Sequence, residues 1–343
     1  MRHFILLIIV LFTACNSSKT MVNKPQILPP QDRLSDARVL STKTGCYPSS
    51  WSNDGHLLAF WNDRKGGPIC SQAYVLDLNN PDHDKGDVVR ISPGYGRALD
   101  PEFLPGDTTL MYTTTHLFEI KECYGDTVKP FFLRMRSMNT IFTSTVKGMM
   151  GEQIMGSNAV DAQARVSPDG KMMVFTTNRT VSYGIWRCNP DGSNPQPIVD
   201  GYYFAGEARF SPNGEHIVFR ARKSAPKAKE IVGTSDLDLR ETEIYMCKID
   251  GSELVRLTDF RAAAANPYFH PDGEHILFSS NHHRSDNKRN LFALNIINNT
   301  VQQITSGDAD ETHPIVHPDG KRLAYSALFN DDREVFLANF SLK

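Results

Sequence analysis

The sequence predicts an all-β fold: a six-bladed β-propeller closed by an N-terminal strand that completes the last blade. Three observations favour it, namely a six-fold repeat, four strand-like segments in each repeat, and a last repeat that lacks its fourth segment. In each repeat an aromatic residue or Val stands two positions before the Pro or Asn of a Gly-bearing turn, and an aromatic follows seven positions later. The six sets are Trp51/Asn53/Phe60, Phe103/Pro105/Tyr112, Val166/Pro168/Phe175, Phe210/Pro212/Phe219, Phe269/Pro271/Phe278 and Val316/Pro318/Tyr325.

Each repeat is expected to contribute four antiparallel strands. The first strand ends at the turn, and the second alternates apolar residues up to the aromatic, as at Met173 and Phe175. An apolar residue followed by an aromatic marks the third strand: Ala73-Tyr74, Ile141-Phe142, Ile185-Trp186, Ile244-Tyr245, Leu291-Phe292 and Val335-Phe336. The fourth strand is short, and its positions are residues 90–92, 153–155, 256–258 and 303–305.

The last repeat has no fourth strand of its own, since it stops at Lys343 directly after its third. A segment with the fourth-strand pattern, Arg-Val-Leu-Ser at residues 38–41, stands before the first repeat instead. We expect this segment to complete the last blade, because closing the ring removes an exposed sheet edge. The propeller is therefore expected to span residues 37–343.

The first residues have the pattern of an export signal. Arg2 and His3 precede an apolar run at residues 4–12 that is too short to cross a bilayer as a mature helix. Residues 1–14 are therefore predicted to be a signal peptide. Small residues before Cys15 resemble a bacterial lipobox, in which that Cys is lipidated and becomes the first mature residue. Phe12 stands where Leu is usual, so simple cleavage after Ala14 is the alternative.

Lipidation would place the protein in the bacterial periplasm, anchored to the outer membrane by Cys15. Residues 15–36 would then be a lipidated N-terminus and a flexible tether, rich in Ser, Lys, Pro and Gln. Five cysteines would remain, of which Cys188 and Cys247 occupy equivalent core positions in successive repeats. Cys70 and Cys123 are the disulfide candidates.

The charge balance does not favour a polyanionic partner. The chain has 37 Lys and Arg against 39 Asp and Glu, a formal net charge of −2. This balance gives no electrostatic reason to expect nucleic acid or an anionic membrane surface as a partner. Membrane contact is thus expected through the lipid anchor only, and the protein is expected to be a monomer.

The turns carry a family resemblance. Residues 167–170 (Ser-Pro-Asp-Gly), 270–273 and 317–320 (both His-Pro-Asp-Gly), together with the Ile-Tyr/Trp third strands and Arg-Leu-Thr fourth strands, resemble the TolB-type propeller repeat. The resemblance covers nearly all of residues 37–343. TolB carries a further α/β domain that links it to the Tol–Pal envelope system, and residues 16–36 are too few for such a domain. The resemblance therefore implies an exported, propeller-only protein that binds something, and it gives only weak support for the TolB role itself.

Uneven spacing of the repeats points to one functional face. Successive turn positions lie 52, 63, 44, 59 and 47 residues apart. The surplus falls between second and third strands, at about residues 117–137 and 223–241, which places both long loops on one face. Long loops on a rigid scaffold usually carry function. The opposite face has tight turns, which we expect to leave little room for recognition.

The innermost strands are expected to line a polar central channel. Five residues before each turn Pro or Asn stand Pro48, Asp100, Gln163, Glu207, Asn266 and His313, and two residues further on stand Ser50, Glu102, Arg165, Arg209, Tyr268 and Ile315. The candidate ligand-binding residues are Asp100, Glu102, Gln163, Arg165, Glu207, Arg209, Asn266, Tyr268 and His313, with His282 and His283 of the blade-five loop. A polar channel without a ligand is one interpretation. The other is a sugar or peptide end held by Arg165 and Arg209 through forked hydrogen bonds.

Metal chemistry has one candidate cluster. The loop after the second strand of blade five and the start of blade six would bring His282, His283 and His313 together beside Asp310 or Glu311, and such a set suits a transition metal. Solvated loop histidines are the simpler interpretation, so we predict no catalytic residue, no cofactor and no resident metal, with a divalent metal as the alternative. No Gly-x-Ser-x-Gly elbow or Gly-rich phosphate loop occurs in the sequence.

Two functions fit these features. The first is a non-catalytic binding or scaffolding lipoprotein of the cell envelope, with a protein, peptide or glycan as its partner. The second is a metal-dependent polysaccharide lyase or hydrolase with its site at the channel mouth, because some exported propellers that resemble this repeat class cleave acidic sugars.

Overall fold

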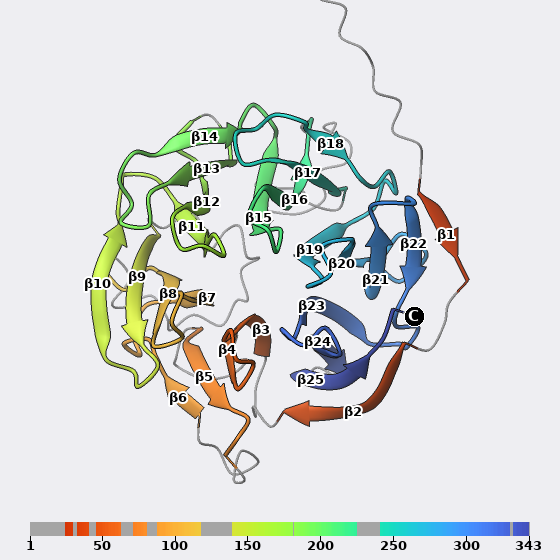
Figure 1. The fold of residues 1–343 in the computed structure, drawn as a ribbon, viewed down its shortest axis with the longest axis horizontal. Coiled ribbons are helices and arrows are strands. Elements are labelled where there is room, and N and C mark those ends of the chain that lie inside the picture. Colours follow the sequence, from red (N-terminus) through yellow and green to blue (C-terminus); the bar gives the residue numbers. More distant parts are fainter. Residues whose placement is uncertain are drawn as a thin grey trace, which may run out of the picture.

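The computed structural model describes residues 25–29, 33–40, 46–62, 71–80, 88–117, 139–180, 182–224, 241–329 and 332–342. Within these ranges the chain forms six sheets, five of four strands and one of five. The sheets stand around a central axis with the first strand of each repeat innermost (Figure 1). The prediction of an all-β, six-bladed propeller is confirmed.

Blades one to three use consecutive strands, ordered from the axis outward. Their strands are β3 (Cys46–Trp51), β4 (Leu57–Asn62), β5 (Ala73–Asp77), β6 (Val88–Arg90), β7 (Ala98–Phe103), β8 (Thr109–Thr114), β9 (Thr140–Thr145), β10 (Met150–Met155), β11 (Asp161–Val166), β12 (Met173–Thr177), β13 (Gly184–Cys188) and β14 (Gln196–Val199).

Blades four to six follow the same order, and two strands from the start of the chain join them. Their strands are β15 (Phe204–Phe210), β16 (His216–Arg222), β17 (Glu243–Lys248), β18 (Val255–Arg256), β19 (Ala264–Phe269), β20 (His275–Ser280), β21 (Asn290–Asn295), β22 (Thr300–Gln303), β23 (Asp310–Val316), β24 (Arg322–Phe329) and β25 (Asp332–Phe340), with β1 (Gln26–Leu28) and β2 (Leu34–Leu40).

The repeated aromatic residues set the register of every blade. The second-strand aromatic lies directly opposite the third-strand aromatic, and such cross-strand pairs stabilise antiparallel sheets. The pairs are Phe60–Tyr74, Tyr112–Phe142, Phe175–Trp186, Phe219–Tyr245, Phe278–Phe292 and Tyr325–Phe336. All six second-strand aromatics are buried.

The hydrophobic core lies between the blades. Six larger clusters of buried apolar residues occur in the described part of the chain, one at each contact between neighbouring blades. At the closing contact, Leu58 and Phe60 of blade one pack with Ala324 and Leu337 of blade six. No blade buries its two faces by itself. Each blade is therefore held in place around the axis by the two blades next to it.

The N-terminal segment closes the ring and also extends its neighbour. Strand β2 pairs antiparallel with β25, with Val39 opposite Phe336, as predicted. Strand β1 pairs parallel with β22 at the outer edge of blade five (Figure 1). Residues 26–28 were predicted to belong to a flexible tether, but they form a strand. The edge of β22 offers unpaired backbone groups with which they pair.

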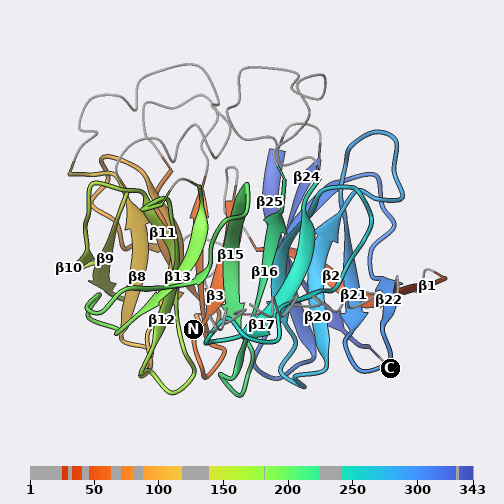
Figure 2. The ribbon, with the colours of Figure 1, turned by 90° about the horizontal axis from the view of Figure 1, so that it is seen from above.

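Side chains join neighbouring blades at the face of the tight turns. This face lies along the lower edge of Figure 2. The Nε2 of His317 lies 3.0 Å from the Gly55 carbonyl oxygen, and the Nε2 of His270 lies 3.1 Å from that of Gly320. In blade two, the Asp107 carboxylate accepts a hydrogen bond from the backbone N–H of Asn53 at 2.9 Å. These contacts hold the inner turns in a fixed circle.

Some predictions fall outside the described residues. These are the signal peptide, the lipidated Cys15, Cys70, Cys123 and most of the two long loops, since residues 1–24, 63–70, 118–138 and 225–240 are not described. Cys188 and Cys247 are free and buried, as predicted. No helix in the described part of the chain is long and apolar enough to span a bilayer.

Candidate binding site in the central channel

Each innermost strand carries a β-bulge on its channel side. In blades two to six the bulge places one non-Gly residue in the left-handed region, a conformation that Asn, Asp and His tolerate best. These residues are Asp100 (φ 52°), Gln163 (φ 56°), Glu207 (φ 58°), Asn266 (φ 53°) and His313 (φ 53°), which we call the channel ring. All five were predicted to bind ligand.

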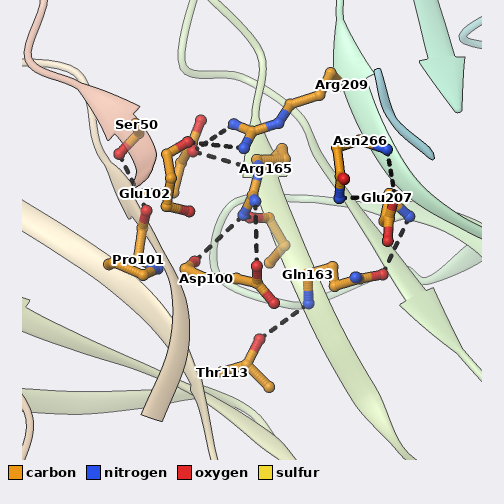
Figure 3. Close-up of polar contacts among 12 residues, drawn as sticks. Ser50, Asp100, Pro101, Glu102, Thr113, Gln163, Arg165, Glu207, Arg209 and Asn266 are labelled. Atoms are coloured by element: carbon orange, nitrogen blue, oxygen red, sulfur yellow. Dashed lines mark hydrogen bonds and ion pairs between the residues drawn. The ribbon is translucent and has the colours of Figure 1, made fainter. Parts of the chain in front are cut away.

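Three members of the channel ring are joined by hydrogen bonds from blade to blade (Figure 3). The side-chain oxygen of Gln163 accepts the backbone N–H of Glu207 at 3.1 Å. A Glu207 carboxylate oxygen accepts the N–H of Asn266 at 2.8 Å, and its other oxygen lies 3.0 Å from Arg220. The side-chain oxygens of Gln163 and Glu207 therefore accept hydrogen bonds from backbone N–H groups of the protein itself.

Asp100 is the least satisfied member of the channel ring. Its side chain is buried, and Oδ2 has no hydrogen-bond partner among the described residues. The Oδ1 atom lies 3.9 Å from Nη2 of Arg165. Burial raises the pKa of the Asp100 carboxyl above its ordinary value, although Arg165 and Arg209 oppose the shift.

His313 packs on aromatic rings of blade one. Its ring centroid lies 4.8 Å from that of Tyr47, and its Nδ1 lies 3.0 Å from the Thr312 hydroxyl. Burial, followed by the nearby Arg289 and Arg333, holds the pKa of His313 well below its ordinary value. The imidazole is therefore neutral at pH 7.

Two residues further along the strands, charged side chains meet across the channel. Arg209 donates from Nη1 to Glu102 Oε2 at 3.0 Å and from Nη2 to the Ser49 carbonyl at 2.7 Å. Arg165 Nε lies 3.3 Å from the same Glu102 oxygen. The Arg209 guanidinium also lies 5.3 Å from the centroid of the Tyr268 ring. We call Ser50, Glu102, Arg165, Arg209 and Tyr268 the charged floor.

The charged floor closes the inner end of a cavity of about 330 Å³. The last residues of the innermost strands line its sides: Trp51, Phe103, Val166, Phe210, Phe269 and Val316. Val166 and Phe210 are partly exposed, whereas the other four are buried in the core between blades. The residues that open the turns form its exposed mouth: Asn53, Pro105, Pro168, Pro212, Pro271 and Pro318. The cavity thus lies at the tight-turn end of the channel, so the prediction that this face has little room is wrong. Fixed turns around the axis leave a central opening even where each turn is short.

The structure divides the predicted site residues into three groups. Glu102, Arg165, Arg209 and Tyr268 line the cavity, and four residues of the channel ring precede them by two positions on the same strands, while His313 has the equivalent position on β23. His282 and His283 lie elsewhere in blade five, where His282 stacks on Phe260 with ring centroids 4.0 Å apart. Burial lowers the pKa of His282 to about 4.

The three candidate histidines do not form a metal-binding group. His283 Nε2 lies 2.9 Å from the Asn290 side-chain oxygen, whereas His313 packs on Tyr47. Asp310 pairs with Arg289 at 2.8 Å and with Arg333 at 2.7 Å. Among the residues that the structure describes, no three His, Cys, Asp or Glu side chains are grouped as metal ligands would be.

The prolines of the mouth and Ser50 were not among the predicted site residues. Ser50 joins blades one and two, because its hydroxyl donates to the Pro101 carbonyl at 3.0 Å and accepts the N–H of Phe103 at 3.2 Å. The signal for the mouth was already in the repeat. Five Pro residues at one position of a closed ring must face a common axis.

Sequence comparisons find distant relatives. No family model matches the chain. An uncharacterized protein of Agrobacterium fabrum is 30% identical over 115 residues, which are 33% of this chain and 37% of that protein. The uncharacterized peptidase YuxL of Bacillus subtilis is 21% identical over 204 residues, 53% of this chain and 29% of the peptidase. The chain thus spans about a third of the length of these curated relatives.

Solved structures with the same fold match this chain over more of its length than the sequence relatives do. TolB from Acinetobacter baumannii has a TM-score of 0.58 at 17% identity, covering 85% of this chain and 65% of that one. A protein assigned as TolB in Agrobacterium tumefaciens scores 0.60 at 17% identity, covering 89% and 94%. An oligogalacturonate lyase in complex with manganese scores 0.55 at 14% identity, covering 93% and 98%. The chain therefore has the six-bladed propeller fold of the TolB structures.

Proposed function

We propose that this protein is an exported, non-catalytic binding module of the bacterial cell envelope, with a protein, peptide or glycan as its partner. The observation that carries the proposal is the cavity of about 330 Å³ at the tight-turn end of the channel, with charged residues at its inner end. Concave sites with few, well-placed polar groups are typical of ligand binding. The TolB-like fold supports an envelope role by analogy only.

Photo-crosslinking in growing cells tests the site. A crosslinking amino acid at Asn53, in the mouth, is expected to give discrete adducts with an envelope component. The matched control carries the same amino acid at Gln196, which is exposed on the outermost strand of blade three, and is expected to give none of these adducts. Identical adducts at both positions, or none at Asn53, would remove the proposed site.

We further propose that the module is a periplasmic lipoprotein, held at the outer membrane by lipidated Cys15. The support is the sequence pattern of residues 1–15. Replacing Cys15 by Ser is expected to move the protein from the membrane fraction to the soluble periplasmic fraction. If the wild-type protein is already soluble, simple cleavage after Ala14 is the correct interpretation.

The alternative is a metal-dependent polysaccharide lyase or hydrolase at the channel mouth. Only the likeness to the oligogalacturonate lyase favours it, and at 14% identity that likeness concerns the fold. The described residues do not fit a metal, because His282 and His283 have other partners and lie apart from His313. Bound manganese or zinc, together with polysaccharide cleavage that is lost when the three histidines are replaced, would reverse this choice.

A further inference from the structure

The charged floor has more hydrogen-bond donors than its own acceptors use. A guanidinium has five N–H donors, and among the described residues those of Arg209 reach Glu102 and the Ser49 carbonyl. Arg165 is more fully used, since its Nη1 donates to the Ala164 and Asp100 carbonyls, its Nη2 lies 3.9 Å from Asp100 Oδ1, and its buried Nε lies 3.3 Å from Glu102. Arg209 is thus the guanidinium with donors left at the inner end of the cavity. A second carboxylate, with two oxygens in one plane, matches the remaining donors of Arg209.

The sides of the cavity are less polar than its floor. Of the strand-end residues that line them, Val166 and Phe210 are partly exposed, whereas Trp51, Phe103, Phe269 and Val316 are buried in the core between blades. A group that reaches the floor therefore passes the apolar side chains of Val166 and Phe210 and the prolines of the mouth. At about 330 Å³ the cavity is at the lower end of the usual range for ligand pockets. It accommodates the end of a chain rather than a folded domain.

The rim outside the mouth has the opposite charge. Five of the six inner turns carry an aspartate, which we call the mouth aspartates: Asp54, Asp107, Asp169, Asp272 and Asp319. The Ser52 and Ser167 hydroxyls donate to Asp54 and Asp169 at 2.6 Å and lower the pKa of these two carboxyls, so both are ionised at pH 7. In the described part of the chain, Lys171 pairs with Asp169 and Arg322 with Asp319, and the Nδ1 of His275 lies 2.7 Å from Asp272. The rim therefore opposes a simple anion and attracts positive charge.

We propose that the cavity binds the C-terminal end of a peptide, with its carboxylate on Arg209, its last side chain beside the partly exposed Val166 and Phe210, and basic residues upstream against the mouth aspartates. This inference rests on the proposed function and names the ligand class of the same site. The three layers of the cavity differ in charge and polarity, and each part of such a chain end meets a layer that complements it.

Two pools of random hexapeptides test the ligand class. Both carry an N-terminal fluorophore; one has a free C-terminal carboxylate and the other a C-terminal amide. The purified mature protein is expected to bind the free-carboxylate pool about tenfold or more tightly, since a charge-assisted hydrogen bond is lost in the amide. Selected peptides are expected to end in an apolar residue and to carry Lys or Arg upstream. Equal binding of both pools, Asp or Glu upstream, or no binding to either would overturn the inference.

The Arg209→Gln variant tests whether the preference for a free carboxylate over an amide comes from the charged floor. It is expected to reduce the advantage of carboxylate over amide by about tenfold, because it removes the fork and the charge. The control is Arg187→Gln, which removes hydrogen bonds to the Ile249 carbonyl and Gln196 away from the channel and should leave the advantage unchanged. Arg209→Lys keeps the charge without the fork and should give an intermediate advantage. Thermal melting confirms that each variant is folded. An unchanged advantage in Arg209→Gln would overturn the inference.

The two proposals fail in different ways. Adducts at Asn53 in cells, combined with equal binding of the two peptide pools, would overturn the C-terminal ligand and leave the binding module intact. The absence of both adducts and peptide binding would remove the two together.

Discussion

In blades two to five the channel ring and the charged floor lie two residues apart on the same strands, and Glu207 of the ring and Arg209 of the floor use their polar side chains in different ways. Gln163 and Glu207 in the ring accept backbone N–H groups of the next blade. Arg209 in the floor crosses from blade four to blades one and two and still has donors that the described residues leave unused. Polar residues that face a propeller channel are thus of two kinds. One kind satisfies the fold, and the other is available to a ligand.

The bulge explains the difference. In β15 the register shifts between Gly206 and Arg209, and the backbone N–H of Glu207 leaves the ladder to meet Gln163. A buried N–H without an acceptor is costly, so the preceding blade must supply one. Two residues later Arg209 is again opposite Val218 in the ladder, and its side chain is not needed for backbone hydrogen bonds.

The largest expected effect concerns the ring. Glu207→Ala removes the acceptor of the Asn266 N–H and the carboxylate beside Arg220. We expect the free energy of unfolding to fall by about 3 kcal/mol, as when one partner of a buried ion pair is removed. Urea denaturation measures it. The control Glu152→Ala, on the exposed side of β10, should change stability by less than about 0.5 kcal/mol. If the free energy of unfolding fell by less than about 1 kcal/mol in Glu207→Ala, the channel ring would not have the structural role inferred for it.

A smaller effect on stability is expected from the floor. In Arg209→Gln, Glu102 keeps Arg165 as its partner at 3.3 Å, so about 1 kcal/mol should be lost. The same urea denaturation compares it directly with Glu207→Ala. Equal losses in the two variants would break the distinction, because the floor would then be as structural as the ring.

The fold could be predicted because its signal repeats. Six copies of one aromatic spacing define both the blades and the register, since Phe60 and its equivalents pair with the third-strand aromatics. Strand β1 could not be predicted in this way. Residues 26–28 have no counterpart in the repeats, and they pair with β22 through backbone groups that any sequence offers.

The site could be predicted only in part. Alternation along the strands placed Glu102, Arg165 and Arg209 on the channel, and they line the cavity. Their pairing was not predictable, since Arg209 and Glu102 are 107 residues apart in the chain. The bulges break the alternation, and the sequence holds no direct mark of them. The expectation that the long loops carry function stays a prediction, since residues 118–138 and 225–240 lie outside the described part of the chain.

The smallest effect concerns Asp100, where ring and floor meet. Burial raises the pKa of its carboxyl in the folded protein. The folded state therefore holds this proton more tightly than the unfolded chain does, and the associated stability is lost as the pH rises from the unfolded pKa to the folded pKa. Asp100→Asn cannot titrate at this position. The stability of the variant relative to wild type should thus increase with pH across this window and then level off.

Urea denaturation of both proteins between about pH 4 and pH 7 measures that difference. Asp169→Asn supplies a control of opposite sign. The Ser167 hydroxyl lowers the pKa of Asp169 in the folded protein, so wild-type stability from this group appears as the pH rises through the unfolded pKa. Because the unfolded pKa of an aspartate is about 3.9, its variant should lose stability relative to wild type as the pH rises to about 4 and then level off, in a measurement extended down to about pH 2. If Asp100→Asn followed the same direction as Asp169→Asn, Arg165 would outweigh burial at Asp100. The carboxyl of Asp100 would then belong with the ion pairs of the floor rather than with the hydrogen-bonded ring.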